Sequence, residues 1–99
     1  MIILDNNKVL KLSLAEETAT IPIQWTASYR GVSKQCTGCA SCATTLEVQG
    51  TNDGTTVSTL IAAPAESSNI YTFTNEVSFI SVTNIDTIAH TVTIYIYDG

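Results

Sequence analysis

The chain has 99 residues and a formal net charge of -5, with 44% hydrophobic and 13% charged residues. This length suits one domain, because 99 residues are too few to form two hydrophobic cores. The apolar share excludes a disordered tail, and the acidic excess disfavours contact with a phosphate backbone. We therefore expect a single folded domain over residues 1–99 with no nucleic-acid partner.

The sequence shows no apolar run close to the ~20 residues that are needed to cross a bilayer. Residues 1–7 contain neither a basic cluster nor an apolar segment followed by small residues, as a secretory signal would. We therefore expect a soluble chain that has no membrane partner and is made in a cytosol.

The whole chain is expected to be all β, since the sequence contains 16 Thr, 11 Ile and 7 Val. Branched side chains pack well on a pleated surface and lose rotamers in a helix. A short opening pair of strands is expected across residues 5–7. The alternation of Leu10, Leu12 and Leu14 with polar residues then predicts a half-buried strand. Residues 14–19 hint at a helix, but two threonines favour a turn.

The central part of the chain predicts a second half-buried strand and then a hairpin. Pro22 has no N–H for a ladder, so the second strand either lies at an edge or begins at a bulge. Residues 44–49 and 55–62 are expected to pair across the turn residues at 50–54. The second strand shares one face among five residues, Ile21, Ile23, Trp25, Ala27 and Tyr29.

The last part of the chain predicts a loop at residues 63–69 and strands at 70–74 and 77–83, which are separated by Asn75 and Glu76. A turn at residues 84–87 leads into the most regular strand, residues 88–97, in which Tyr95 and Tyr97 share one face. The opposite face is apolar and contains Ile88, His90, Val92, Ile94 and Ile96.

This pattern amounts to about eight short strands, with turn signals at the spacing of about 8 to 12 residues that is typical of β-sandwiches. Each strand buries one face, so two sheets must pack together. We therefore predict an all-β fold: a single antiparallel β-sandwich of the jelly-roll type.

Three cysteines, Cys36, Cys39 and Cys42, follow a Cys-x-x-Cys-x-x-Cys pattern between two predicted strands. Thiolates at this spacing can bind zinc, but a structural zinc site takes four ligands and the single histidine lies on a predicted apolar face. An iron–sulfur cluster lacks a ligand in the same way. The alternatives are an exposed thiol or disulfide loop, and cysteines that pack as small apolar side chains. We favour packing and expect no metal or cofactor, with these cysteines as the candidate ligands if a metal binds.

Residues 83–92 resemble the segment of cupredoxins that carries their first copper histidine. A blue-copper site needs a cysteine and a second histidine, which in cupredoxins follow this segment. Here His90 is the only histidine and every cysteine precedes it. We therefore expect Asn84 and Asp86 to form a turn and His90 to be a strand residue in the core or at an interface.

No catalytic pattern accompanies the single histidine. The sequence contains no nucleophile elbow, no glycine-rich phosphate loop and no closely spaced carboxylate pair at a plausible site. We expect no enzymatic activity and no catalytic residues. Trp25 or Tyr29 could serve a carbohydrate-binding module as a stacking platform, but their alternation with Ile21 and Ile23 favours the core. Tyr95 and Tyr97 either cover the sheet or form a contact surface.

The order of these segments resembles small virion proteins of tailed bacteriophages. The resemblance spans nearly the whole chain and rests on residues 10–14, 23–29, 58–65 and 80–93. It implies a non-enzymatic virion component, a capsid decoration (cement) protein above all, with a tail or fibre adaptor as the alternative. The cysteine motif departs from what the resemblance leads us to expect, and it leaves open an insertion that binds metal or cross-links.

The resemblance also implies partners and location. The partner would be the phage major capsid protein or another virion protein, and the site of action the virion, after synthesis in the host cytoplasm. A decoration protein that bridges neighbouring subunits stabilises the assembled shell because it binds that state alone. A homo-oligomer, a trimer or another cyclic assembly, would suit a local symmetry axis.

Overall fold

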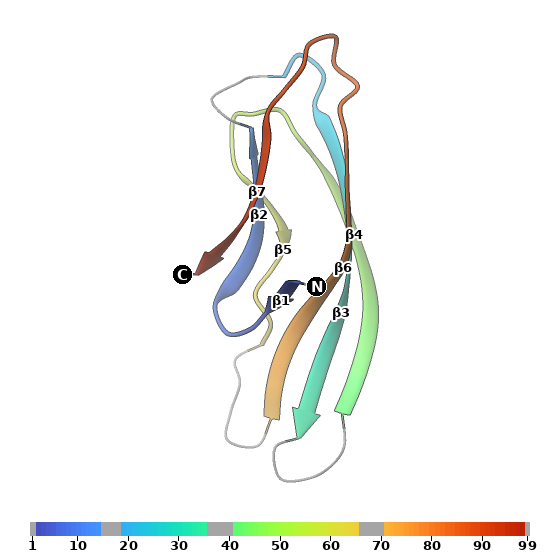
Figure 1. Ribbon diagram of the computed structural model, residues 1–99, viewed down its shortest axis with the longest axis vertical. Coiled ribbons are helices and arrows are strands. Elements are labelled where there is room, and N and C mark those ends of the chain that lie inside the picture. The colour runs from blue at the N-terminus through green and yellow to red at the C-terminus, as the bar shows by residue number, and fades with distance from the viewer. Residues whose placement is uncertain (1, 15–18, 36–40, 66–70, 99) are drawn as a thin grey trace.

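The computed structural model describes residues 2–14, 19–35, 41–65 and 71–98. These residues form seven strands and no helix, in two antiparallel sheets that pack face to face (Figure 1). The predicted all-β sandwich is therefore confirmed. The described strands number seven, in sheets of four and three, where a jelly roll has eight strands. Three of them are long, with 12 or 13 residues each.

The four-stranded sheet has the order β1-β6-β3-β4, and the three-stranded sheet has the order β5-β2-β7. The strands of the larger sheet are β1 (Ile2–Leu4), β6 (Tyr71–Thr83), β3 (Ile23–Gln35) and β4 (Ser41–Asn52). Those of the smaller sheet are β5 (Ser58–Ile61), β2 (Lys8–Leu14) and β7 (Val92–Asp98).

Both predicted hairpins are wrong in their pairing, since the strands involved belong to different sheets. β1 pairs with β6 and β2 pairs with β7, so the turn at residues 5–7 crosses between the sheets. Asn7 takes a left-handed conformation there, with φ of 66°. β4 pairs with β3 and β5 pairs with β2, so residues 53–57 make a second crossing. Turn residues therefore predict where the chain changes direction, but they do not predict which strands pair with each other.

The expected break between residues 70–74 and 77–83 is also absent, because β6 runs through Asn75 and Glu76. β3 lies beside it over this stretch, and Arg30 pairs with Glu76 both in register and through an ion pair of 2.7 Å. The irregularity is a bulge, with a register shift between Ser28 and Tyr29. β3 lies between β6 and β4, so it is a central strand and not the edge strand that Pro22 suggested. Because β3 begins at Ile23, Pro22 lies outside the ladder and its missing N–H removes no hydrogen bond between strands.

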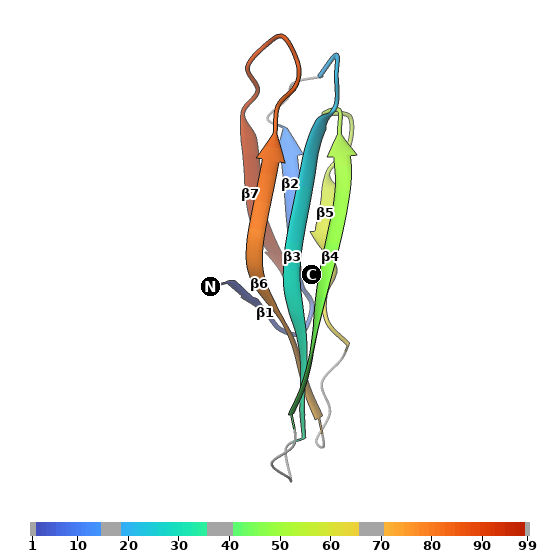
Figure 2. The same ribbon diagram turned by 90° about the vertical axis from the view of Figure 1, so that its right-hand side faces the viewer.

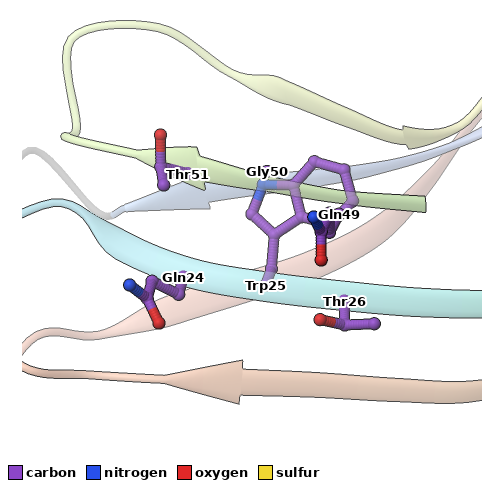
Figure 3. A pocket seen from close by; sticks show the side chains of 6 residues that line it. All are labelled: Gln24, Trp25, Thr26, Gln49, Gly50 and Thr51. Carbon is purple, nitrogen blue, oxygen red and sulfur yellow. The ribbon is translucent and has the colours of Figure 1, made fainter.

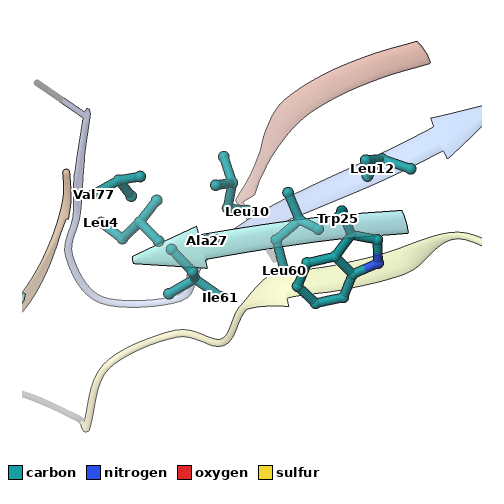
Figure 4. Close-up of a cluster of buried hydrophobic side chains, with 8 residues drawn as sticks. All are labelled: Leu4, Leu10, Leu12, Trp25, Ala27, Leu60, Ile61 and Val77. Atoms are coloured by element: carbon teal, nitrogen blue, oxygen red, sulfur yellow. The ribbon is translucent and has the colours of Figure 1, made fainter. Parts of the chain in front are cut away.

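The core fills the space between the two sheets (Figure 4). Leu10, Leu12 and Leu14 are buried from β2, and Ile23, Trp25 and Ala27 from β3, as the alternation predicted. Ile21 precedes the strand and is exposed. The main cluster consists of Leu4, Leu10, Leu12, Trp25, Ala27, Leu60, Ile61 and Val77.

The molecule is elongated, with extents of 54 × 24 × 17 Å and a radius of gyration of 15.7 Å. A compact chain of this length would have a radius of gyration near 13 Å. The reason is visible in Figures 1 and 2: β3, β4 and β6 continue past the end of the three-stranded sheet. We call this extension, residues 29–35, 41–46 and 71–76, the arm.

Candidate functional site

The cysteine motif occupies the connection between β3 and β4. Cys36 and Cys39 lie outside the described residues, so the thiol and metal alternatives stay as predictions. Cys42 belongs to β4, and its backbone lies opposite Ser33 of β3. In the part of the chain that the structure describes, no three histidine, cysteine or acidic residues gather as a metal site would require.

The connection between β6 and β7 is an ordered turn, as Asn84 and Asp86 predicted. The side-chain oxygen of Asn84 accepts a hydrogen bond of 2.9 Å from the N–H of Asp86, and its amide donates to the carbonyl of Ile88 at 3.0 Å. Oδ1 of Asp86 accepts from the N–H of Thr87 at 2.7 Å. These local bonds replace the ladder bonds that a strand would have supplied.

The predicted position of His90 on a strand is wrong, because β7 begins at Val92. His90 lies in the connection, where its Nε2 is 2.8 Å from Oδ2 of Asp86. The two side chains are 0% and 1% exposed. The same Oδ2 accepts a hydrogen bond of 2.9 Å from the N–H of Thr20, which precedes β3. The pair therefore fastens two connections to each other at one end of the sandwich.

Hydrogen bonding also sets the acidity of Asp86. The bond from His90, followed by those from the backbone N–H groups of Thr87 and Thr20, lowers the pKa of Asp86 from 3.8 to about 2, and desolvation opposes this shift. Bonds of this kind stabilise the ionised form of a carboxylate. A carboxylate and an imidazole could act as an acid–base pair, but both side chains are buried in this turn. The geometry supports a structural role.

Trp25 is a core residue, and its side chain reaches across β4 above Gly50 (Figure 3). Its Nε1 is buried with no hydrogen-bond partner among the described residues. Trp25 and Gly50 line a shallow depression of about 290 Å³ together with Gln24, Thr26, Gln49 and Thr51. Trp25 is only 8% exposed, which leaves little of its indole for the stacking platform of a carbohydrate-binding module.

The outer face of the three-stranded sheet carries an aromatic surface. Lys11 lies opposite Tyr95, and its ammonium group is 4.3 Å from the centre of the Tyr97 ring. Tyr95 is half-buried and Tyr97 is exposed, so both of the alternatives for these tyrosines have some support: Tyr95 covers the sheet and Tyr97 is open to a partner. The sequence could not show that Lys11 joins them.

The arm is the feature that the sequence missed. Leu46 lies opposite Tyr29 at its base and is 43% exposed. Along the arm, the amide of Asn75 donates to the carbonyl of Ala62 at 3.1 Å and so holds the segment after β5 against the strands. Pro64, Ala65 and Phe73 are among the residues that line a shallow surface depression of about 150 Å³ there.

Comparison with known proteins finds no relative of this chain. The chain matches no protein-family model, no curated protein and no solved structure. No helix in the described residues is long and apolar enough to span a membrane.

Proposed function

We propose that this protein is a non-enzymatic component of a tailed-phage virion, a capsid decoration protein that bridges neighbouring copies of the major capsid protein. The observation that carries the proposal is the arm, which presents exposed side chains such as Leu46 beyond the sandwich. The resemblance of the sequence to small virion proteins gives the class of partner.

The arm suits bridging for a physical reason. The 54 Å length of the molecule lets its two ends contact different subunits of a shell. Binding energy that exists only in the assembled shell adds to the free energy needed to open it, and repetition over the shell multiplies a modest contact. The acidic charge of the chain keeps it away from packaged DNA.

The test is rebinding to capsids that were assembled without the protein. We expect saturable binding and a higher melting temperature of the shell. Leu46→Lys, which places a charge at the base of the arm, should weaken binding, because the new ammonium group would be desolvated in the contact. Val57→Lys is the matched control: Val57 is similarly exposed but belongs to the crossing between β4 and β5, away from the arm.

Two results would contradict the proposal. Binding to tails or fibres but not to capsids would assign the protein to the alternative, a tail or fibre adaptor. Equal loss of capsid binding in both lysine variants would show that the arm has no special part in attachment.

A further inference from the structure

One side of the sandwich is open, between β6 and β7. In the three-stranded sheet β7 is the edge strand, and β1 covers β6 only at residues 75–77. Residues 78–83 of β6 therefore have no described strand on that side. Figure 1 shows β7 and β6 in separate sheets, with the connection 84–91 above them and β1 below; Figure 2 shows both strands along the same side.

Apolar side chains that the sequence pattern assigns to a core lie at this opening. Ile94 and Ile96 are in register with the buried Leu12 and Leu10, so they point to the inner face of the sheet. Yet they are 37% and 45% exposed. Across the opening, Ile80 and Val82 of β6 are only half-buried. The alternation of β7 is that of a buried strand, but the described chain does not cover it.

The edge strand β7 also lacks the features that prevent edge strands from pairing with strands of other molecules. Natural edge strands carry charges, prolines or bulges, or are very short, so that other strands do not pair with them. β1 and β5 are short, and β4 carries Glu47. β7 has no charge before Asp98 at its end, no proline, and a regular register with β2. Its free N–H and C=O groups can therefore accept another strand.

We infer that β7 is a self-association surface, on which the β7 strand of a second copy of this chain pairs antiparallel about a two-fold axis. An isologous contact of this kind needs only one self-complementary patch. With Tyr95 at the centre, Ile94 of each copy lies beside Ile96 of the other, so the exposed isoleucines cover one another. The inference does not depend on the virion proposal.

Charge does not oppose a second copy on this side. The chain is acidic, so two copies repel each other wherever their carboxylates come close. In the antiparallel arrangement the Asp98 residue of each copy lies beside Val92 of the other, and the two carboxylates are at opposite ends of the paired strands.

The pairing also joins two three-stranded sheets into one continuous sheet. Because one strand pair buries less than a standard interface, we expect a concentration-dependent dimer.

The test is sedimentation velocity of the full chain over a wide concentration range, in reducing buffer so that disulfides between chains cannot contribute. We expect a monomer–dimer equilibrium. Ile96→Lys should raise the dissociation constant by at least about tenfold, because a lysine would be desolvated in the contact. Leu46→Lys is the control, since Leu46 is 43% exposed on a different strand edge and its variant should dimerise like the natural chain.

Hydrogen exchange of the natural chain provides a measurement that does not depend on a variant's folding. Protection of β7 amides should rise with concentration, whereas protection of β4 amides should stay constant. The inference would be overturned by a chain that is monomeric at every concentration, by a trimer, or by equal effects of Ile96→Lys and Leu46→Lys.

Discussion

Gly50 lies directly opposite Trp25, and the indole ring occupies the space that a side chain at position 50 would need. A Cβ added at Gly50 would lie 2.6 Å from Cζ2 and 2.9 Å from Cε2 of Trp25. A Cβ atom does not approach another carbon that closely, so the ring would have to leave its place in the core. The smallness of Gly50 therefore fixes the position of the largest core side chain.

We expect Gly50→Ala to destabilise the protein by about 1 to 3 kcal/mol, the usual cost of overpacking a core. Gly31→Ala is the matched control in the neighbouring strand, because its Cβ would meet its nearest atom, Oδ1 of Asn75, at an ordinary 3.5 Å. Removing a glycine from a strand should there be neutral or slightly stabilising. Urea unfolding of both variants measures the difference, and equal midpoints would contradict the steric account.

Single residues also show what the sequence could and could not predict. The burial of Leu10 and Leu12 was predictable, because a period of two puts them on one face whatever strand lies beside them. Asn52 was not. It is buried, and its amide donates to the carbonyl of Thr56 at 3.0 Å and the hydroxyl of Ser58 at 2.8 Å. These bonds turn the chain from one sheet to the other, but in sequence the same residues look like a hairpin turn.

At the scale of elements, the connection between β6 and β7 depends on one carboxylate. Asp86 binds His90, Thr20 and Thr87, so its ionised form holds together residues that are distant in sequence. The sequence predicted the turn from Asn84 and Asp86 but placed His90 in the strand, because alternation continues through the turn by coincidence. The i, i+4 spacing of Asp86 and His90 is too common a pattern to have predicted their contact.

This arrangement predicts a stability loss in acid. The pKa of Asp86 is lowered from 3.8 to about 2, so its contribution to the free energy of unfolding is complete above about pH 4 and is lost as the pH falls towards 2. Thermal unfolding between these pH values should show the decline. Asp86→Asn should unfold at a lower temperature near neutral pH and lose less on acidification, whereas Glu47→Gln, a change at an exposed carboxylate, should behave like the natural chain. Parallel curves for all three proteins would contradict this role.

At the scale of the whole molecule, the sandwich and the arm are stabilised differently. In the sandwich, the strands bury side chains such as Leu12 and Ala27 between two sheets. In the arm, the same β3, β4 and β6 hydrogen bonds continue, but none of the described strands forms a second sheet over residues such as Leu46. The sequence could not predict this division, since the threonine-rich alternation is similar in both parts and the overlap of two sheets is a tertiary property.

Hydrogen exchange should therefore separate the two parts. Local opening is easiest where few apolar contacts hold a strand, so the amides of residues 31–33 should exchange at least about tenfold faster than those of residues 25–27 in the same strand. Leu12→Ala should lower the free energy of unfolding by about 2 to 5 kcal/mol and speed exchange throughout the sandwich. Leu46→Ala should have a small effect that is confined to the arm. If exchange along β3 is uniform, the arm opens only with the whole molecule, and something other than the second sheet determines its stability.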